Sequence, residues 1–416
     1  MEEENKIIKD IYEPYFSQFP DYYKVFSELL NNVIYKDNDC SFPLKYKLFY
    51  GLMASSTMGC EYLLEDFKRI FLNLIGDVSW VEQGLKCKDI PENIKGIASI
   101  NNILAHKPWI MDWRYFAVFK NGLSSFLFQS AIILSTIQRF ATILSTFKIM
   151  IYFDILEDKK KNDNLEKEEE KPKEETDKNE EKEENEVKAK NDDEKDKSDE
   201  EKDKNEDINE IKRKKKKKKA EKIEEDIQKV IKSIKNKIEF KEVEEEKNNA
   251  TNKKEIFKKY IYELIVSYSD FNPHVEKYLY VEDFSWKTEA KYFFIDLARK
   301  DMEYLEKEFN FIDNMIIENE TKTEAIVNYV MLIFGIRDNE YNYHNNNLYL
   351  SLEEKRIIKK IACYPEQIHQ QELSECLTQL SKKQFIHLIF IVAATKQKIS
   401  LTFFAKTFEE FRSQNL

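Results

Sequence analysis

The sequence predicts an all-α protein, and two observations support this fold class. The 416 residues include only 7 glycines and 8 prolines, which leaves little turn chemistry for a many-stranded sheet. Apolar residues recur at helical spacing in several stretches, and Phe128 to Tyr152 is expected to be a long, mostly buried helix. With 42% hydrophobic residues, at least part of the chain must pack into a core.

A charged segment divides the chain into two ordered parts. No aromatic residue occurs between Phe153 and Phe240, and residues 157–210 hold 26 acidic side chains against 14 lysines, whereas the whole chain has a net charge of −11. Such a segment cannot bury enough apolar surface to offset its ordering entropy. We therefore expect two helical domains, 1–155 and 256–416, joined by a long, charged and largely disordered linker, 156–255.

The second half of this linker has two further features. An unbroken basic octet, 212–219, could be a nuclear-localisation signal or could bind nucleic acid or an anionic membrane. No aromatic side chain is interleaved to stack on bases, so we expect a solvated charge run and no specific nucleic-acid partner. Beyond it, Ile223, Ile227, Val230, Ile231, Ile234 and Ile238 form one apolar stripe at helical spacing, which could dock on a domain or a partner.

Cysteine usage and the first residues indicate the cytoplasm, with the nucleus as a further location. The five cysteines form no CxxC pair and no zinc spacing, and the acidic start is no signal peptide. The uncharged stretch Asn121 to Gln138 holds eight polar side chains, so we expect a buried helix and no membrane span. The histidines make no metal constellation, and neither a metal nor a cofactor is expected.

Near the C-terminus, one decapeptide points to a partner surface. Phe334 to Tyr343 begins at the end of an apolar helical run and contains Gly335, the only glycine after Gly122. The chain then turns polar, acidic and aromatic, which predicts exposed Tyr, Asp and Glu side chains at a helix end. The helices expected in this part are 287–308, 321–334, 353–362, 366–380 and 382–410, the last opened by a Ser381–Gln384 capping box.

Five segments, in order, resemble the sestrin family. They are Leu52-Met53-Ala54 with Gly59-Cys60-Glu61-Tyr62-Leu63, Ile103-Leu104-Ala105-His106-Lys107-Pro108-Trp109-Ile110, Val281-Glu282-Asp283-Phe284-Ser285-Trp286, Asn328-Tyr329 through Phe334-Gly335-Ile336-Arg337 to Tyr341-Asn342-Tyr343, and Cys363-Tyr364-Pro365-Glu366. The resemblance covers both ordered parts and implies two related helical domains, the first similar to bacterial alkylhydroperoxidase D. It further implies a stress- and nutrient-signalling regulator, in which the second domain binds leucine and a complex of the GATOR type to restrain TOR complex 1.

Cys60 is the candidate nucleophile, because a peroxidatic thiol must be deprotonated by a nearby base or positive field. In the family a Tyr and a His complete a proton relay; Tyr62 is present here, but Phe67 stands at the His position. Cys60 also lies on an apolar stripe with Leu63, Leu64, Phe67, Ile70, Phe71 and Leu74. We therefore expect a structural core thiol and no enzyme; an alkylhydroperoxidase-type peroxidase using Cys60 is the alternative.

The positions of the family's amino-acid pocket have also changed. A free amino acid needs a cation for its carboxylate and an anion for its ammonium group. The resemblance puts these roles on Thr323 and Gln384, the pocket floor on Leu377, and a nearby histidine on His387. Because both charges are missing, we expect no leucine binding; Gln384 is interpreted as a helix cap and His387 as a satisfied core histidine.

Of the functions that the resemblance implies, partner binding is the one that we most expect this chain to retain. The resemblance implies that Asn339 and Glu340 stand where the family has two acids that contact the GATOR partner. Arg337, Tyr341 and Tyr343 flank them, and aromatic and charged residues together are typical of binding hot spots. The sequence thus predicts a sestrin-like regulator that acts by protein–protein binding. A second alternative is a non-enzymatic scaffold that binds partners through the apolar stripe. Deletion of 157–255 would distinguish the two, because the regulator should still bind its partner.

Overall fold

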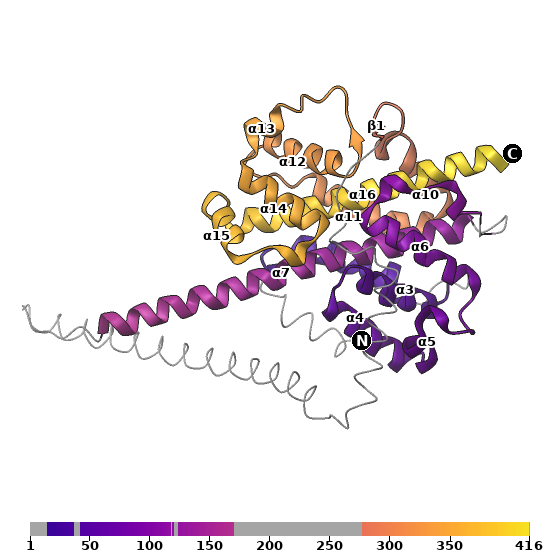
Figure 1. The fold of residues 1–416 in the computed structure, drawn as a ribbon, viewed down its shortest axis with the longest axis horizontal. Helices are drawn as coiled ribbons and strands as arrows, with labels where there is room; N and C mark the ends of the chain where they lie inside the picture. The colour runs from indigo at the N-terminus through magenta and orange to yellow at the C-terminus, as the bar shows by residue number, and fades with distance from the viewer. Residues whose placement is uncertain (1–14, 37–41, 118, 120–123, 170–276, 416) are drawn as a thin grey trace, which may run out of the picture. The chain divides into compact units, whose positions relative to one another are not determined.

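The computed structural model describes residues 15–36, 42–117, 119, 124–169 and 277–415. The basic octet at 212–219 and the apolar stripe at 223–238 lie outside the described residues. The strands among the described residues are β1 (Leu279–Tyr280) and β2 (Ile336–Arg337), of two residues each, and the other elements are helical. The predicted all-α class is therefore confirmed (Figure 1).

The first part of the chain is a succession of helices that ends in one very long helix. Its elements are α2 (Pro20–Leu30), η1 (Asn31–Tyr35), α3 (Leu44–Thr57), α4 (Glu61–Leu74), α5 (Val78–Gln83), η2 (Gly84–Lys86), α6 (Glu92–His106), η3 (Pro108–Ile110), η4 (Trp113–Tyr115) and α7 (Ser124–Glu169). The predicted buried helix at 128–152 is part of α7. On α4 the predicted apolar face is buried at Leu63, Phe67, Ile70 and Phe71 and half-buried at Leu64, whereas Leu74 at its end is 54% exposed.

The last part repeats this plan, with a long helix at its end. Its elements are β1, η6 (Trp286–Ala290), α10 (Lys291–Leu297), α11 (Arg299–Asp313), α12 (Glu320–Ile333), β2, α13 (Asn345–Tyr349), α14 (Leu352–Cys363), η7 (Pro365–Gln367), α15 (Gln370–Gln379) and α16 (Lys382–Asn415).

Two helix predictions in this part need correction. The stretch 366–380 is divided into η7 and α15, with Ile368 and His369 between them. The stretch 287–308 was expected to be a single helix, but it is divided into η6, α10 and α11. The break lies at Ala298, whose φ of −144° and ψ of 43° are outside the helical region. No Pro or Gly marks this break, and α11 starts again directly at Arg299. The chain therefore changes direction here to bring α11 against α2, with which it packs.

The core is built on α7 and α16, which run antiparallel. The ring of Phe128 meets that of Phe404 edge-on at 5.2 Å between centroids, and near the other end Phe147 meets Phe390 at 6.0 Å. Residue numbers thus rise along one helix while they fall along the other. Such aromatic pairs bury large apolar areas and add a preferred geometry to the packing.

The same two helices contain the most apolar stretches, Ser124–Ile151 and Lys382–Gln414. By length and composition either could cross a membrane, yet 100% and 94% of their most apolar windows are buried inside the protein. The stretch predicted as a buried helix is indeed buried from Phe126 to Gln138. Both helices therefore form the centre of the core.

The described residues up to Lys159 and those from 277 onward belong to one compact unit. Contacts between the two parts include Phe16 and Tyr22 against Phe390, with ring centroids 6.2 and 4.2 Å apart. The division into domains at 1–155 and 256–416 stays a prediction. Both parts nevertheless share one aromatic core, which positions the features described next.

Candidate functional site

The decapeptide that begins at Phe334 forms a turn, a short strand and a loop at the end of α12. Gly335 has a φ of 85°, a left-handed conformation that favours glycine and ends the helix. Ile336 and Arg337 then pair in parallel with Leu279 and Tyr280. Phe334 itself is buried, and its ring lies 6.2 Å from that of Trp109 in the first part. The buried side chain of Phe334 therefore anchors the start of this segment in the core.

The two tyrosines of this segment fold back and hold the loop. The Tyr343 hydroxyl accepts a hydrogen bond from the backbone amide of Asp338 at 3.0 Å, and the Tyr341 hydroxyl donates to Asn346 at 2.9 Å. Their rings meet edge-on at 5.1 Å, and both side chains are half-buried. The expectation of exposed tyrosines was therefore wrong, because their hydroxyls find partners within the loop.

The exposed residues of the decapeptide are Arg337, Asn339, Glu340 and Asn342. The backbone amide of Asn339 donates to Glu282 at 2.8 Å, and that of Glu340 donates to Asp338 at 2.8 Å. The side chains of Asn339 and Glu340 are thus presented from a backbone held by hydrogen bonds. Exposed apolar side chains follow shortly afterwards in the chain, namely Leu348, Tyr349 and Leu352, which are 63%, 39% and 58% exposed.

Cys60 lies immediately before α4 and is 3% exposed. Burial raises the pKa of its thiol, an effect offset only in part by hydrogen bonds from Leu63 and Ser145 and by the charge of Lys148. Tyr62 is 39% exposed, and the Nζ atom of Lys148 lies 5.1 Å from the centroid of its ring. A thiol with a raised pKa and little solvent access is a poor nucleophile at neutral pH.

Phe67, at the relay position, is part of the packing between α3 and α4. It is fully buried, and its ring lies so close to Gly51 that a Cβ atom there would sit 2.2 Å from the Phe67 Cδ1 atom. The aromatic ring therefore occupies the space that a side chain on Gly51 would need. His106 is the half-buried histidine of this region, and its Nε2 atom lies 3.2 Å from the Thr57 carbonyl oxygen. Burial lowers the pKa of His106 to about 3, so its ring stays neutral.

Two of the four positions aligned with the amino-acid pocket, Thr323 and Gln384, have local structural roles. The Thr323 hydroxyl accepts from the Ile317 amide at 2.8 Å and donates to the Asn319 carbonyl at 3.0 Å. The Gln384 side chain accepts from the Ser381 amide at 2.9 Å, and the Gln384 amide donates to the Ser381 hydroxyl at 3.3 Å. The predicted capping box at the start of α16 is therefore confirmed.

His387 and Leu377 are only partly buried. The His387 ring packs against Phe19 at 4.9 Å, and burial lowers the pKa of the imidazole. Its Nδ1 atom, however, has no hydrogen-bond partner among the described residues. His387 is thus not the satisfied core histidine that the sequence predicted.

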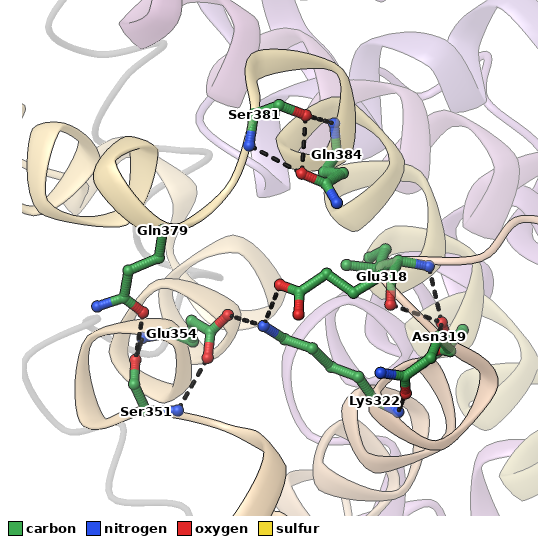
Figure 2. A network of polar contacts seen from close by, with 10 residues as sticks. Glu318, Asn319, Lys322, Ser351, Glu354, Gln379, Ser381 and Gln384 are labelled. Carbon is green, nitrogen blue, oxygen red and sulfur yellow. Dashed lines mark hydrogen bonds and ion pairs between the residues drawn. The ribbon is translucent and has the colours of Figure 1, made fainter.

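Sequence reasoning missed a buried ion cluster beside Thr323. The Nζ atom of Lys322 lies 2.6 Å from Glu354 and 2.5 Å from Glu318 (Figure 2). Glu354 also caps α14 by accepting from the Ser351 amide at 2.8 Å. Ser351 with Glu354 three residues on was a readable capping signal, but nothing in the sequence places Lys322 beside it. In Figure 2, Gln384 turns back on Ser381 and no drawn contact joins it to Lys322.

Comparison with protein-family models matches residues 8–411 to the family described as PA26 p53-induced protein (sestrin). The chain belongs to the sestrin family. Among curated proteins, this sestrin is 33% identical to Sestrin-1 of Macaca fascicularis over 73 residues, which are 18% of the chain and 14% of that protein. It is 33% identical to the Sestrin homolog of Drosophila melanogaster over 97 residues, 23% and 18% of the two chains. With the Sestrin homolog of Dictyostelium discoideum it shares 25% over 162 residues, 35% and 26% of the two chains.

These matches span at most about a quarter of the relatives' length. They support membership of the family without assigning any residue of this sestrin a role. Within the described residues, no group of three or more His, Cys, Asp or Glu side chains could hold a metal ion.

Proposed function

We propose that this sestrin is a signalling regulator of the cytoplasm that binds a protein complex of the GATOR type and thereby restrains TOR complex 1. Contact is made by the loop that follows β2, with Glu340 and Asn339 at its exposed tip and Arg337 beside them. The tyrosines of the loop act as its internal supports, because their hydroxyls hold Asp338 and Asn346.

One observation carries the proposal: an exposed acid stands on a backbone that is already ordered. The tip residues are fixed through Glu282 and Asp338 at 2.8 Å each, so little conformational entropy is lost when a partner binds. A charge held in this way contributes to specificity and association rate. Partner binding as proposed therefore requires the charge of Glu340 and does not require a buried ligand.

The test is co-precipitation of the partner complex with Glu340→Lys protein from cells. We expect a loss of binding without a change in melting temperature, because Glu340 is exposed. Glu303→Lys, an equally exposed acid-to-lysine change on α11, is the matched control and should bind normally. Unchanged binding by Glu340→Lys would contradict the proposed surface.

The scaffold alternative is separated by a second variant. Protein that lacks residues 170–255 keeps every described element, so the proposed regulator should still bind its partner complex. Loss of binding on this deletion, with an unchanged melting temperature, would favour a scaffold that acts through the charged segment.

A further inference from the structure

A cavity of about 670 Å³ lies among η6, α11, α12, β2 and α16. Its volume is within the range of roughly 300–1,000 Å³ that is typical of small-molecule sites. Of the four positions aligned with the family's amino-acid pocket, only Thr323 borders it, and the hydroxyl of Thr323 is engaged with the loop before α12. The cavity is therefore separate from Leu377, Gln384 and His387.

The walls of the cavity are mainly apolar. Trp286 and Phe309 meet edge-on at 5.6 Å, and aliphatic side chains from α11, α12 and α16 complete the surface. These walls include Ile312, Val327 and Ile391. A ligand that fills this space needs an apolar body, since burying a polar group here without a partner is costly.

Acidic side chains in the wall are mostly engaged already. Asp313 pairs with Lys398, Glu306 with Lys291, and Asp338 accepts from the amide of Glu340. Of the four acids that line the cavity, only Glu324 has no such partner among the described residues. The open carboxylate oxygens of the wall are therefore those of Glu324 and the Oε2 atom of Glu306, which has no hydrogen-bond partner among the described residues.

The hydrogen-bond donors of the cavity wall are less fully paired than its acidic side chains. Lys287 and Lys291 both line the cavity and are four residues apart on η6 and at the start of α10. Lys287 has no acidic partner in the described part of the chain, and Lys291 reaches Glu306 only at 3.6 Å. The Trp286 indole N–H and the Thr395 hydroxyl also make no hydrogen bond with described residues. The cavity wall thus presents the ammonium group of Lys287, the ammonium group of Lys291 beside Glu306, and the indole donor of Trp286.

We propose that this cavity binds a small amphipathic carboxylate, with its acid group at Lys287 and Lys291 and its apolar body along Trp286 and Phe309. Charge-assisted hydrogen bonds from ammonium groups to a carboxylate are among the stronger polar contacts. The apolar walls supply the remaining affinity through surface removed from water.

Three probes of equal chain length and different head group test this assignment. Decanoate, decanol and decylammonium are titrated into the full-length protein below their micellar concentrations, with tryptophan fluorescence and melting temperature as readouts. We expect saturable binding of decanoate with a rise in melting temperature, and weaker binding of the other two. Absence of saturable decanoate binding, or binding of decylammonium as tight as that of decanoate, would overturn the proposal.

Variants of Lys287 and Lys291 test whether the carboxylate of the ligand binds at these two side chains. In Lys287→Met/Lys291→Met protein we expect decanoate to bind about tenfold more weakly or worse, while decanol binding is unchanged. Lys88→Met, an exposed lysine on the first part of the chain, is the control and should leave both affinities intact. Decanoate binding that is equal in the double variant and the wild type would place the carboxylate elsewhere and refute the assignment.

Discussion

Arg139 and Glu308, which are 169 residues apart in the sequence, form an ion pair inside the protein, with Nη1 2.5 Å from Oε2. Their side chains are 1% and 0% exposed. The Tyr22 hydroxyl donates to the other oxygen of Glu308 at 3.0 Å. This cluster joins α2, α7 and α11, and so connects the two parts of the chain at one point.

Breaking this ion pair on one side should be strongly destabilising. Arg139→Met leaves a buried carboxylate without its cation, and we expect a loss of about 3–5 kcal/mol in the free energy of unfolding. Urea denaturation measures it. Arg114→Met, which breaks the exposed Arg114–Asp112 pair, is the control and should change the free energy of unfolding little, because water screens exposed ion pairs.

Removing both charges should restore most of that loss. The Nε and Nη2 atoms of Arg139 have no hydrogen-bond partner in the described residues, so the wild-type pair is itself incompletely satisfied. Arg139→Met/Glu308→Met with Tyr22→Phe should therefore approach wild-type stability. A triple variant as unstable as Arg139→Met alone would show that the charges are not the cause.

Gly51 and Phe67 provide a second test, of packing. Alanine at a helix interior is ordinarily better than glycine by about 1 kcal/mol. At Gly51 the new Cβ would lie 2.2 Å from the Phe67 ring, and such overpacking costs typically about 1–3 kcal/mol or more. We expect Gly51→Ala to be destabilising in urea denaturation, and markedly less so in a Phe67→Leu background. Equal effects in both backgrounds would mean that the ring is not the obstacle.

The buried state of Cys60 predicts an inert thiol. Because burial raises the pKa of this thiol, little thiolate is present at neutral pH and reaction with peroxide should be slow. Purified protein should consume alkyl hydroperoxide no faster than Cys60→Ser protein, and iodoacetamide should label Cys60 only after unfolding. Hydroperoxide reduction that is lost in Cys60→Ser would instead support the peroxidase alternative.

Leucine should not bind at the positions inherited from the family. Thr323 and Gln384 use their side chains to hold the start of α12 and α16, and the nearest buried cation, Lys322, is already paired with Glu318 and Glu354. Isothermal titration with leucine should give only heats of dilution, as with isoleucine. Saturable binding of leucine alone would contradict this prediction.

Features of the fold could be predicted from the sequence where they depend on residues close together in the chain. Helical periodicity and the Ser381–Gln384 cap depend on residues three or four apart, and both were predicted correctly. The break at Ala298 carries no Pro or Gly signal and arises from packing of α11 on α2. The inward turn of Tyr341 depends on Asn346 five residues later, beyond the reach of helical spacing.

The charged clusters could not be predicted for a different reason. Arg139 was visible only as the residue that follows an apolar run, and its partner lies in the other part of the chain. Lys322 likewise meets Glu354 only because α12 and α14 pack together. Pairs of this kind depend on tertiary structure, so their residue types in one sequence do not disclose them.

Lys396 predicts an unusual dependence of stability on pH. Its Nζ atom is buried without a hydrogen-bond partner in the described residues and lies 5.6 Å from the centroid of the Phe334 ring. Burial lowers the pKa of this ammonium group from 10.5 to about 8. The unfolded chain therefore binds more protons than the folded protein between about pH 8 and 10.5, and this group makes stability rise with pH across that window.

Below pH 8 the charged amine is retained in both states, and its burial costs on the order of 3 kcal/mol. Lys396→Met should thus be more stable than wild type at pH 7, with a difference that shrinks as the pH rises from about 8 to 10.5. Urea denaturation at several pH values measures it, and taking the difference between the two proteins largely removes the titration of other groups, such as Cys363. A stability difference that does not change with pH would contradict the charge explanation, because loss of packing alone has no proton linkage.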